Sequence, residues 1–414
     1  MAKIVFWALD APGHVNPALA FGKRLAARGH HVGFVAGSTT RGEILAHGFE
    51  CQPPPFDAYN GPLAPHTSMT EVMDIIRGFS ADLILCDVLK SVEALAAKLA
   101  GYRVAFYSVT LPLWSDRIGP SVFSSLPAPT NMPGRAAVKL SWFVNGVRQR
   151  RNRRLIINRS PGYRIVCDFI KSACDRLSFH GSAVNWNTNT GVPLPYFPSI
   201  PTLIMCPREL DFARADAERL FWIDPCILRE RPTALPLPPI DDKRPLIFAS
   251  LGTQAGGTSK ASHWFESVCD AVLSRPEWQA IIAVGPQLFP GLKVRSRHDH
   301  VTIVETVAQH KALERAMVAA IHGGLNSVKE CIMAEVPMAM FPVGVDQPGT
   351  AERVRTRGLG MVGRLEDGPS TIVSMLDNLL HDRARRDRLR SVASTWRRLE
   401  SEDIGARVVE SFLG

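Results

Sequence analysis

A histidine and an aspartate near the amino terminus each follow an apolar, strand-like run, where catalytic side chains gather in α/β proteins. His14 stands in the turn-like stretch after the run Lys3–Leu9, and Asp87 directly follows the run Asp82–Cys86. On neighbouring parallel strands, the Asp87 carboxylate would approach the His14 ring, fix its tautomer and stabilise its protonated form. We therefore expect His14 to remove a proton from a hydroxyl group and Asp87 to orient the ring. The structural alternative is that His14 only shapes a turn and Asp87 only caps the next helix.

A later strand-like run, Val318–Ile321, leads into a Gly-Gly turn and the expected start of a helix. Two glycines let the backbone come close to a ligand, and the free N–H groups and dipole of a helix start suit a phosphate. The alternative is again structural: a polar side chain caps the helix, and Glu330 closes a capping box. The residues of this turn and helix start are His322, Gly323, Gly324, Leu325, Asn326 and Ser327.

The elements that must position these residues alternate between strands and helices, which is typical of parallel sheets covered by helices. The alternation of strands and helices begins at Lys3, stops in a Pro- and Ser-rich segment after Leu111, and resumes at Pro245. The first helix is expected over Ala18–Arg28. The other expected strands are His31–Ala36, Val104–Ser108, Pro245–Ser250, Ala280–Val284, Val301–Val304 and Val336–Phe341.

This pattern predicts an α/β protein with two Rossmann-like, doubly wound domains that face each other across a cleft. A proline-rich stretch near 231–243 indicates a stiff linker between them. We divide the chain into a first domain (1–225), a linker (226–243), a second domain (244–385) and carboxy-terminal helices (386–414) that pack back on the first domain.

Polar residues and prolines at matched spacing surround the Gly-Gly turn. They are Gln309, Glu330, Pro337, Pro342, Asp346, Gln347 and Pro348. Together with the turn they resemble the donor-binding signature of UDP-glycosyltransferases with the GT-B fold. Three further sequence segments, at 13–17, 206–211 and 250–253, also resemble this family, so the resemblance covers nearly the whole chain. The most similar subfamily is that of bacterial enzymes that glycosylate carotenoids or macrolides.

The resemblance implies an inverting, NDP-sugar-dependent hexosyltransferase. It would transfer a sugar from UDP-sugar or dTDP-sugar to a hydroxyl of a hydrophobic small molecule or lipid, with no metal and no further cofactor. Most relatives carry a base-stacking aromatic residue where this chain has Thr306, so the phosphate site is indicated more strongly than the base. The catalytic pair would be His14 and Asp87. The implied donor-binding residues are Ser250, Thr253, Gln309, His322, Gly323, Gly324, Asn326, Ser327, Glu330, Asp346 and Gln347.

The net charge of +9 is concentrated in one part of the chain. Residues 117–167 hold ten Lys and Arg and no Asp or Glu, so the rest of the chain is close to neutral. Two interpretations of the basic segment 135–164 stay open: a solvated arginine face beside a core helix, or contact with anionic lipid headgroups. Nucleic-acid binding is not expected, because the chain has one basic cluster with few aromatic residues. The apolar residues on one face of the helix expected at 136–155 are Leu140, Phe143 or Val144, and Val147.

Several other classes of protein are disfavoured. No apolar run is long enough to cross a bilayer and no signal peptide is evident, so we expect a cytoplasmic protein, with or without membrane association. The eight cysteines are scattered without a C-x-x-C pair, which argues against zinc and a disulfide framework. A nicotinamide-dependent oxidoreductase would need G-x-G-x-x-G after the first strand, where only Gly13 occurs. A non-catalytic sugar-nucleotide-binding protein is the remaining alternative, disfavoured by the joint presence of His14, Glu330, Asp346 and Gln347.

Overall fold

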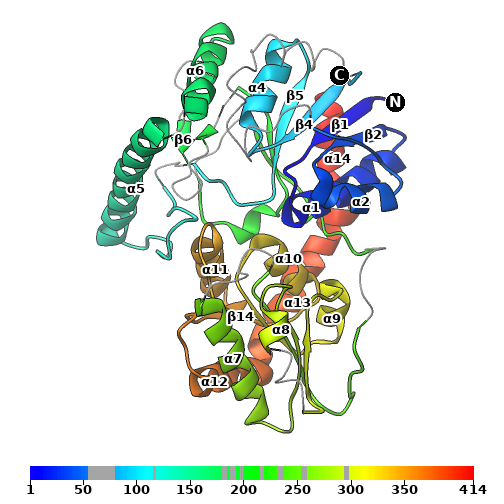
Figure 1. Cartoon of the computed structure of the whole chain (residues 1–414), viewed down its shortest axis with the longest axis vertical. Helices are drawn as coiled ribbons and strands as arrows, with labels where there is room; N and C mark the ends of the chain where they lie inside the picture. Colours follow the sequence, from blue (N-terminus) through cyan, green and yellow to red (C-terminus); the bar gives the residue numbers. More distant parts are fainter. Residues whose placement is uncertain are drawn as a thin grey trace.

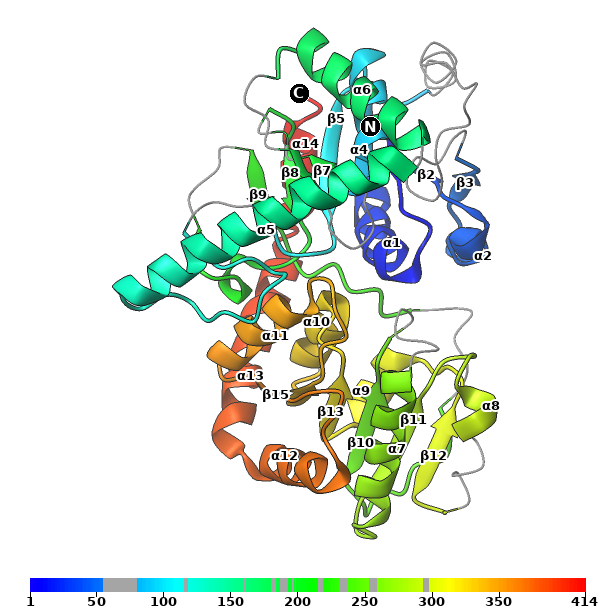
Figure 2. The same ribbon diagram turned by 60° about the vertical axis from the view of Figure 1, so that its left-hand side comes forward.

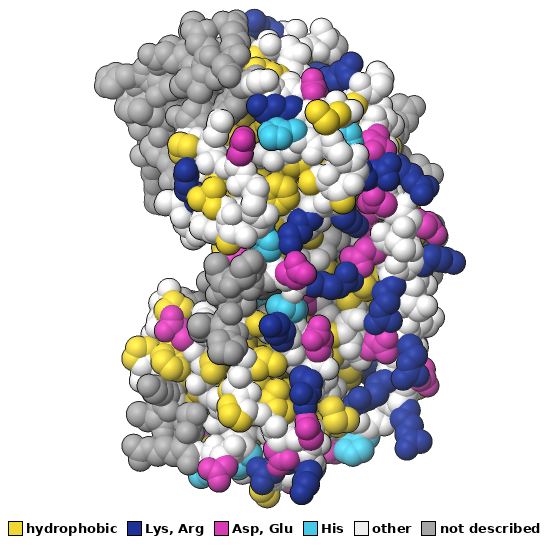
Figure 3. Space-filling model, turned by 90° about the vertical axis from the view of Figure 1, so that its right-hand side faces the viewer, with side chains coloured by type: hydrophobic (Ala, Val, Ile, Leu, Met, Phe, Trp, Pro, Cys, Tyr) yellow, Lys and Arg dark blue, Asp and Glu magenta, His cyan; other side chains and the backbone are white. Residues whose placement is uncertain are grey.

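The chain forms two lobes, each built on a parallel β-sheet covered by helices (Figure 1, Figure 2). This computed structural model describes residues 1–54, 80–114, 118–159, 161–179, 184–186, 193–195, 197, 199–214, 219–230, 237–252, 259–292 and 298–414. In the space-filling view the molecule is hollowed on one side between the two lobes (Figure 3). The predicted architecture of two doubly wound α/β domains is confirmed.

The amino-terminal sheet has seven parallel strands in the order β3-β2-β1-β4-β5-β8-β9. In its centre β1 pairs with β4, with Trp7 beside Cys86. Because both strands run in the same direction, the segments that follow them meet at one edge of the sheet. The strands are β1 (Lys3–Trp7), β2 (His31–Val35), β3 (Glu50–Gln52), β4 (Leu83–Asp87), β5 (Val104–Ser108), β8 (Thr202–Ile204) and β9 (Leu220–Trp222). The helices of this lobe are α1 (Pro12–Ala27), α2 (Ser38–Ala46), α4 (Ser91–Leu99), α5 (Met132–Arg159) and α6 (Pro161–Arg176), and β6 (Val184–Trp186) pairs with β7 (Pro193–Pro195).

The carboxy-terminal sheet repeats the same winding with six parallel strands in the order β12-β11-β10-β13-β14-β15. Its strands are near-continuous apolar runs, because helices cover both faces of a doubly wound sheet. The strands are β10 (Leu246–Ser250), β11 (Gln279–Ala283), β12 (Val301–Val304), β13 (Val318–Ile321), β14 (Met338–Met340) and β15 (Gly360–Val362). The helices are α7 (Ser259–Leu273), α8 (Phe289–Leu292), α9 (Gln309–Arg315), α10 (Leu325–Met333), α11 (Gln347–Thr356) and α12 (Pro369–His381).

The structure corrects the predicted start of the first helix. α1 begins at Pro12, not at Ala18, and it continues through Pro17. Pro12 suits the first position of the helix, because the N–H that proline lacks would have no partner there, whereas Pro17 lies beyond the first turn and removes one hydrogen bond of the helix. The sequence-based prediction also missed the three-residue strands β3, β8, β9 and β15, which are too short to show a periodic pattern.

Two helices end the chain, and each packs on a different lobe. α13 (Arg383–Ser401) lies along α10, where Trp396 is fully buried and Arg397 donates a hydrogen bond to the Met333 carbonyl at 2.8 Å. The prediction that the whole segment 386–414 packs on the first domain is therefore wrong for α13, which belongs to the second.

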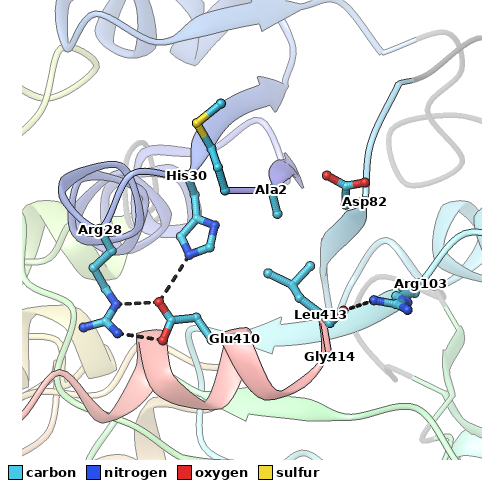
Figure 4. A pocket seen from close by; sticks show the side chains of 9 residues that line it. Ala2, Arg28, His30, Asp82, Arg103, Glu410, Leu413 and Gly414 are labelled. Carbon is cyan, nitrogen blue, oxygen red and sulfur yellow. Dashed lines mark hydrogen bonds and ion pairs between the residues drawn. The ribbon is translucent and has the colours of Figure 1, made fainter.

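The last helix, α14 (Ile404–Ser411), turns away from α13 and reaches the amino-terminal lobe (Figure 1). There the Glu410 carboxylate accepts hydrogen bonds from Nε and Nη2 of Arg28, at 2.7 and 2.6 Å, and faces His30 (Figure 4). The chain thus crosses between the lobes twice, once through the linker region and once between α13 and α14. Residues 231–236 of the predicted linker lie outside the described residues.

Candidate active site

His14 and Asp87 meet at the edge of the sheet where β1 and β4 end. Nδ1 of His14 lies 2.7 Å from Oδ2 of Asp87, and the other Asp87 oxygen accepts a hydrogen bond from the backbone N–H of Leu89 at 2.9 Å. The Asp87 side chain is fully buried, whereas the His14 side chain is 17% exposed. The carboxylate therefore holds a proton on Nδ1 and leaves Nε2 of His14 as the nitrogen that can accept another.

The same contacts argue against purely structural roles for this pair. The residue that caps α4 is Lys90, three positions beyond Asp87, and Asp87 makes no cap hydrogen bond to that helix. His14 lies in the first turn of α1, and its ring is directed to a carboxylate on another strand. The alternative that Asp87 serves only as a helix cap is wrong.

The electrostatic surroundings favour the protonated form of His14. Burial lowers the pKa of His14, but the charge and hydrogen bond of Asp87 and the charge of Asp346 outweigh it, so the pKa lies above its usual value. Lys90 opposes this rise in pKa. Asp346 comes from the other lobe, where burial raises its own pKa and the charge of His14 opposes the rise. The two lobes thus share one electrostatic site.

A hydrogen bond between the lobes links α1, which carries His14, to α10, which follows His322. Pro17 has no N–H, so the carbonyl of Gly13, four residues earlier in α1, has no partner within the helix. The side-chain amide of Asn326 in α10 donates to this Gly13 carbonyl at 2.5 Å. The residue next to His14 therefore contacts the helix that follows His322.

His322 lies between two glycines that leave room for its ring. A Cβ atom at Gly324 would stand 2.4 Å from Nε2 of His322, and one at Gly252 would stand 2.7 Å from Cε1. Burial lowers the pKa of His322 to about 4, so the ring is neutral near pH 7. Its Nδ1 is buried without a hydrogen-bond partner among the described residues. A buried, unsatisfied polar atom beside a helix start is consistent with a ligand that supplies the missing partner.

The start of α10 presents its first N–H groups without a side-chain cap. The cap residue is Gly324, and Ser327 and Glu330 lie inside the helix. Gln309 at the start of α9 donates from Nε2 to Ser327 Oγ at 3.1 Å and to Glu330 Oε2 at 2.6 Å. The capping-box alternative is therefore wrong, because the Glu330 carboxylate faces Gln309 and not a cap residue.

The loop before α11 carries the next two predicted residues, Asp346 and Gln347. Gln347 Oε1 accepts hydrogen bonds from the backbone N–H groups of Val343, at 2.7 Å, and Gly344, at 3.2 Å. Val345 adopts a positive φ of 56°, which is rare for a β-branched residue. Such strain persists only where surrounding contacts enforce it, and it is common at ligand-binding loops. The Gln347 side chain thus shapes the loop that directs Asp346 to His14.

Three other residues were singled out in the sequence, namely Ser250, Thr253 and Thr306. Ser250 ends β10, and its Oγ accepts a hydrogen bond from the N–H of Gly252 at 3.2 Å. Gly252 itself has a positive φ of 72°. Thr253 lies outside the described residues, and Thr306 is exposed between β12 and α9.

Sequence reasoning missed a buried ion pair that holds the lobes together. Arg353 of α11 is fully buried, and its guanidinium donates to Oδ1 of Asp211 at 2.5 Å and to the Pro120 carbonyl at 3.1 Å. Nearby, the N–H of Gly349 donates to the Val122 carbonyl at 2.9 Å, so a side chain at Gly349 would collide with this backbone. The segment 206–211 resembles the family, but an ion pair between Asp211 and Arg353, which are distant in the sequence, leaves no local sequence pattern.

Comparisons with known proteins find similar glycosyltransferases. A family model described as UDP-glucoronosyl and UDP-glucosyl transferase matches residues 291–389. The NDP-glycosyltransferase YjiC of Bacillus subtilis (strain 168) is 28% identical over 173 residues, 42% of this chain and 43% of that protein. The demethyllactenocin mycarosyltransferase of Streptomyces fradiae is 24% identical over 384 residues, 87% of this chain and 75% of that protein. Residues 291–389 thus match the UDP-glycosyltransferase family, and the rest of the chain is similar to a curated glycosyltransferase at lower identity.

The fold of this chain is shared with a solved glycosyltransferase structure over its whole length. The structure of the glycotransferase of kitacinnamycin aligns with a TM-score of 0.71 and 20% identity, covering 100% of this chain and 99% of that one. The GT-B fold that the resemblance implied is therefore confirmed. The family match at 291–389 contains the Gly-Gly turn at 322–327 and Asp346, but neither His14 nor Asp87. The match with YjiC spans less than half of that relative's length.

Proposed function

We propose that this chain is an inverting glycosyltransferase that moves a sugar from a nucleoside diphosphate, UDP or dTDP, to a hydroxyl of a hydrophobic acceptor. The observation that carries the proposal is the contact of Asn326 with the Gly13 carbonyl. It brings a base on one lobe and a phosphate-binding turn on the other to the two sides of one cleft. A transfer reaction needs both parts at once, because the acceptor loses a proton while the diphosphate leaves.

On the donor side, the diphosphate lies at the start of α10. The uncapped N–H groups of the first turn and the neutral ring of His322 donate hydrogen bonds to its oxygens. Glu330, held by Gln309, accepts from the ribose hydroxyls, and Asp346 and Gln347 contact the sugar. Among the described residues, no group of His, Cys, Asp or Glu side chains is arranged to hold a metal ion. The donors stabilise the negative charge that develops on the departing diphosphate.

On the acceptor side, His14 performs the proton transfer. Nε2 takes the proton from the acceptor hydroxyl while its oxygen forms a bond to the anomeric carbon, and the bond from that carbon to the diphosphate breaks. Asp87 stabilises the imidazolium that results, which is consistent with the raised pKa of His14. A single displacement of this kind inverts the configuration at the anomeric carbon.

Two alanine variants separate the base from the phosphate site. We expect His14→Ala to lower kcat by about 10²- to 10⁴-fold without weakening UDP binding, because general-base catalysis contributes about that factor. We expect His322→Ala to weaken UDP binding, measured by calorimetry. His31→Ala is the matched control, because His31 is exposed on β2 away from this edge.

The assay is mass spectrometry of products from UDP- and dTDP-sugars with hydroxylated apolar acceptors. A His14→Ala variant with unchanged turnover would refute the assigned base. The proposal itself would fail if calorimetry detected neither UDP nor dTDP binding and no donor gave a product. Proton NMR of the product tests inversion, and retention of the donor configuration would contradict the single displacement.

A further inference from the structure

Exposed apolar side chains gather on α5. Of the eleven large hydrophobic residues that are most exposed among those the structure describes, five belong to this helix. They are Met132, Leu140, Phe143, Val144 and Val147, with exposed fractions between 46% and 74%. Scattered single apolar residues on a surface need no explanation, but a contiguous group marks an interaction site.

Four of these residues share one face of the helix, because they lie three, four and seven positions after Leu140 or are Leu140 itself. They are Leu140, Phe143, Val144 and Val147. The opposite face holds α5 on the amino-terminal lobe. There Val138 is 2% exposed, and Trp142 donates from its ring N–H to the Gly119 carbonyl at 2.9 Å. The apolar face therefore points away from the protein. Figure 2 shows the amino-terminal half of α5 projecting beyond the lobe.

Basic side chains border this apolar face. Lys139, Arg148, Arg150 and Arg151 are exposed, and on the helix Lys139 and Arg150 lie to one side of the apolar face and Arg148 to the other. Between residues 117 and 167 the chain has ten Lys and Arg and no Asp or Glu. By contrast, the face of the molecule in Figure 3 interleaves basic and acidic side chains. The charge carried by α5 itself is thus of one sign.

We propose that α5 docks on the surface of a bilayer that contains anionic lipids, with Leu140, Phe143, Val144 and Val147 inserted among the headgroups. An interfacial helix combines an apolar face with Lys and Arg on its borders, as α5 does. No described helix is long and apolar enough to span a membrane, so this contact is with the surface only. The uniform positive charge complements a surface of anionic lipid.

Other occupants fit these observations less well. A stable protein–protein interface buries about 800 Å² on each partner with matched shape, which one projecting helix face does not offer. Nucleic acid would place its phosphates against the apolar residues at the centre of the face, whereas those residues gain free energy only in an apolar medium. A bilayer needs no matched shape and accepts both the apolar centre and the basic borders.

Vesicle sedimentation with the full chain tests the proposal. The probes are vesicles of phosphatidylcholine alone and vesicles in which about 30% of the lipid is phosphatidylglycerol. We expect binding to the anionic vesicles only, weakened when the salt is raised from about 0.1 to about 0.5 M, because salt screens the attraction. The Arg148→Gln, Arg150→Gln, Arg151→Gln triple variant should lose about 100-fold in partition coefficient, since each basic residue contributes roughly fivefold.

Apolar insertion is tested by the Phe143→Ser, Val147→Ser double variant, which we expect to bind at least about tenfold more weakly. The charge control removes three exposed arginines elsewhere, namely Arg41, Arg383 and Arg407. The apolar control is Leu45→Ser with Val362→Ser, whose side chains are 48% and 39% exposed. Both controls should bind as the unaltered chain does.

Three results would overturn the proposal. One is the absence of binding to anionic vesicles, and another is binding that both α5 variants retain. The third is a change of self-association in the α5 variants, measured by light scattering, without a change in vesicle binding. That third result would assign the face to a second copy of the chain. Thermal unfolding of each variant shows whether a loss of binding reflects a loss of fold.

Discussion

Replacement of Asp87 by Asn tests the proposed base more sharply than removal of the histidine. The substitution keeps the shape of the side chain and removes only its charge. With the negative charge at 2.7 Å gone, burial becomes the dominant influence on His14 and lowers its pKa. The acid limb of kcat/KM, where His14 loses its proton as the pH rises, should therefore move to lower pH.

The magnitude follows from the contact. A hydrogen bond to a charged group contributes about 1.5–3 kcal/mol. Since one pKa unit corresponds to about 1.4 kcal/mol, the limb should shift down by about one to two pH units. The plateau rate should fall by about 10²- to 10⁴-fold, because the amide no longer holds the Nδ1–H tautomer or stabilises the imidazolium. The raised pKa of His14 also fixes how the free energy of unfolding depends on pH. Protonated His14 stabilises the folded state fully at a pH below the pKa that His14 has in the unfolded chain. This contribution is lost as the pH rises through the pKa that His14 has in the folded protein.

The assay is the pH dependence of kcat/KM for both proteins with the same donor and acceptor. Asp82→Asn is the matched control, because Asp82 lies just before the same strand, where it accepts from the backbone N–H of Lys3 at 2.7 Å. It should leave the limb and the plateau unchanged. An Asp87→Asn variant with an unmoved acid limb and less than a tenfold loss of rate would refute the assignment of His14 and Asp87 as a coupled pair.

Two further substitutions probe the other lobe and the contact between lobes. Gly324→Ala should weaken UDP binding by about tenfold or more in calorimetry, because its Cβ would stand 2.4 Å from Nε2 of His322. Gly344→Ala, where no atom lies within 4 Å of the added Cβ, should bind UDP normally, and equal losses in both would contradict this role of the ring. Arg353→Met should lower the free energy of unfolding by about 1.5–3 kcal/mol, because it removes one charged donor from the buried Asp211 carboxylate, which keeps its ion pair with Arg214. Denaturant unfolding with fluorescence detection measures this change, and a loss below about 1 kcal/mol would show that the pair does not hold the lobes.

The local structure that carries the proposed donor site was predictable from the sequence. Strand β13, the Gly-Gly turn and the start of α10 follow one another within a few residues, and local spacing carries the information. The same is true of the two sheets, whose apolar strands alternate with helices. The positions of His14 and Asp87 could be inferred because β1 and β4 are adjacent parallel strands. The hydrogen bond from Gln309 to Glu330 could not be inferred from the sequence, because a contact between two side chains leaves no local sequence pattern.

The tertiary structure decided what joins the halves. From the sequence, Pro17 indicates only that the Gly13 carbonyl lacks its usual donor within the helix. The fold supplies a donor from Asn326, 313 residues farther along the chain. Arg353 likewise finds Asp211 across 142 residues. The apolar spacing on α5 was visible in the sequence, but such spacing is the same for a face that is covered and a face that is open. The exposed fractions of Leu140 and Phe143 in the folded chain show that this face is open, because burial depends on what the rest of the chain places nearby.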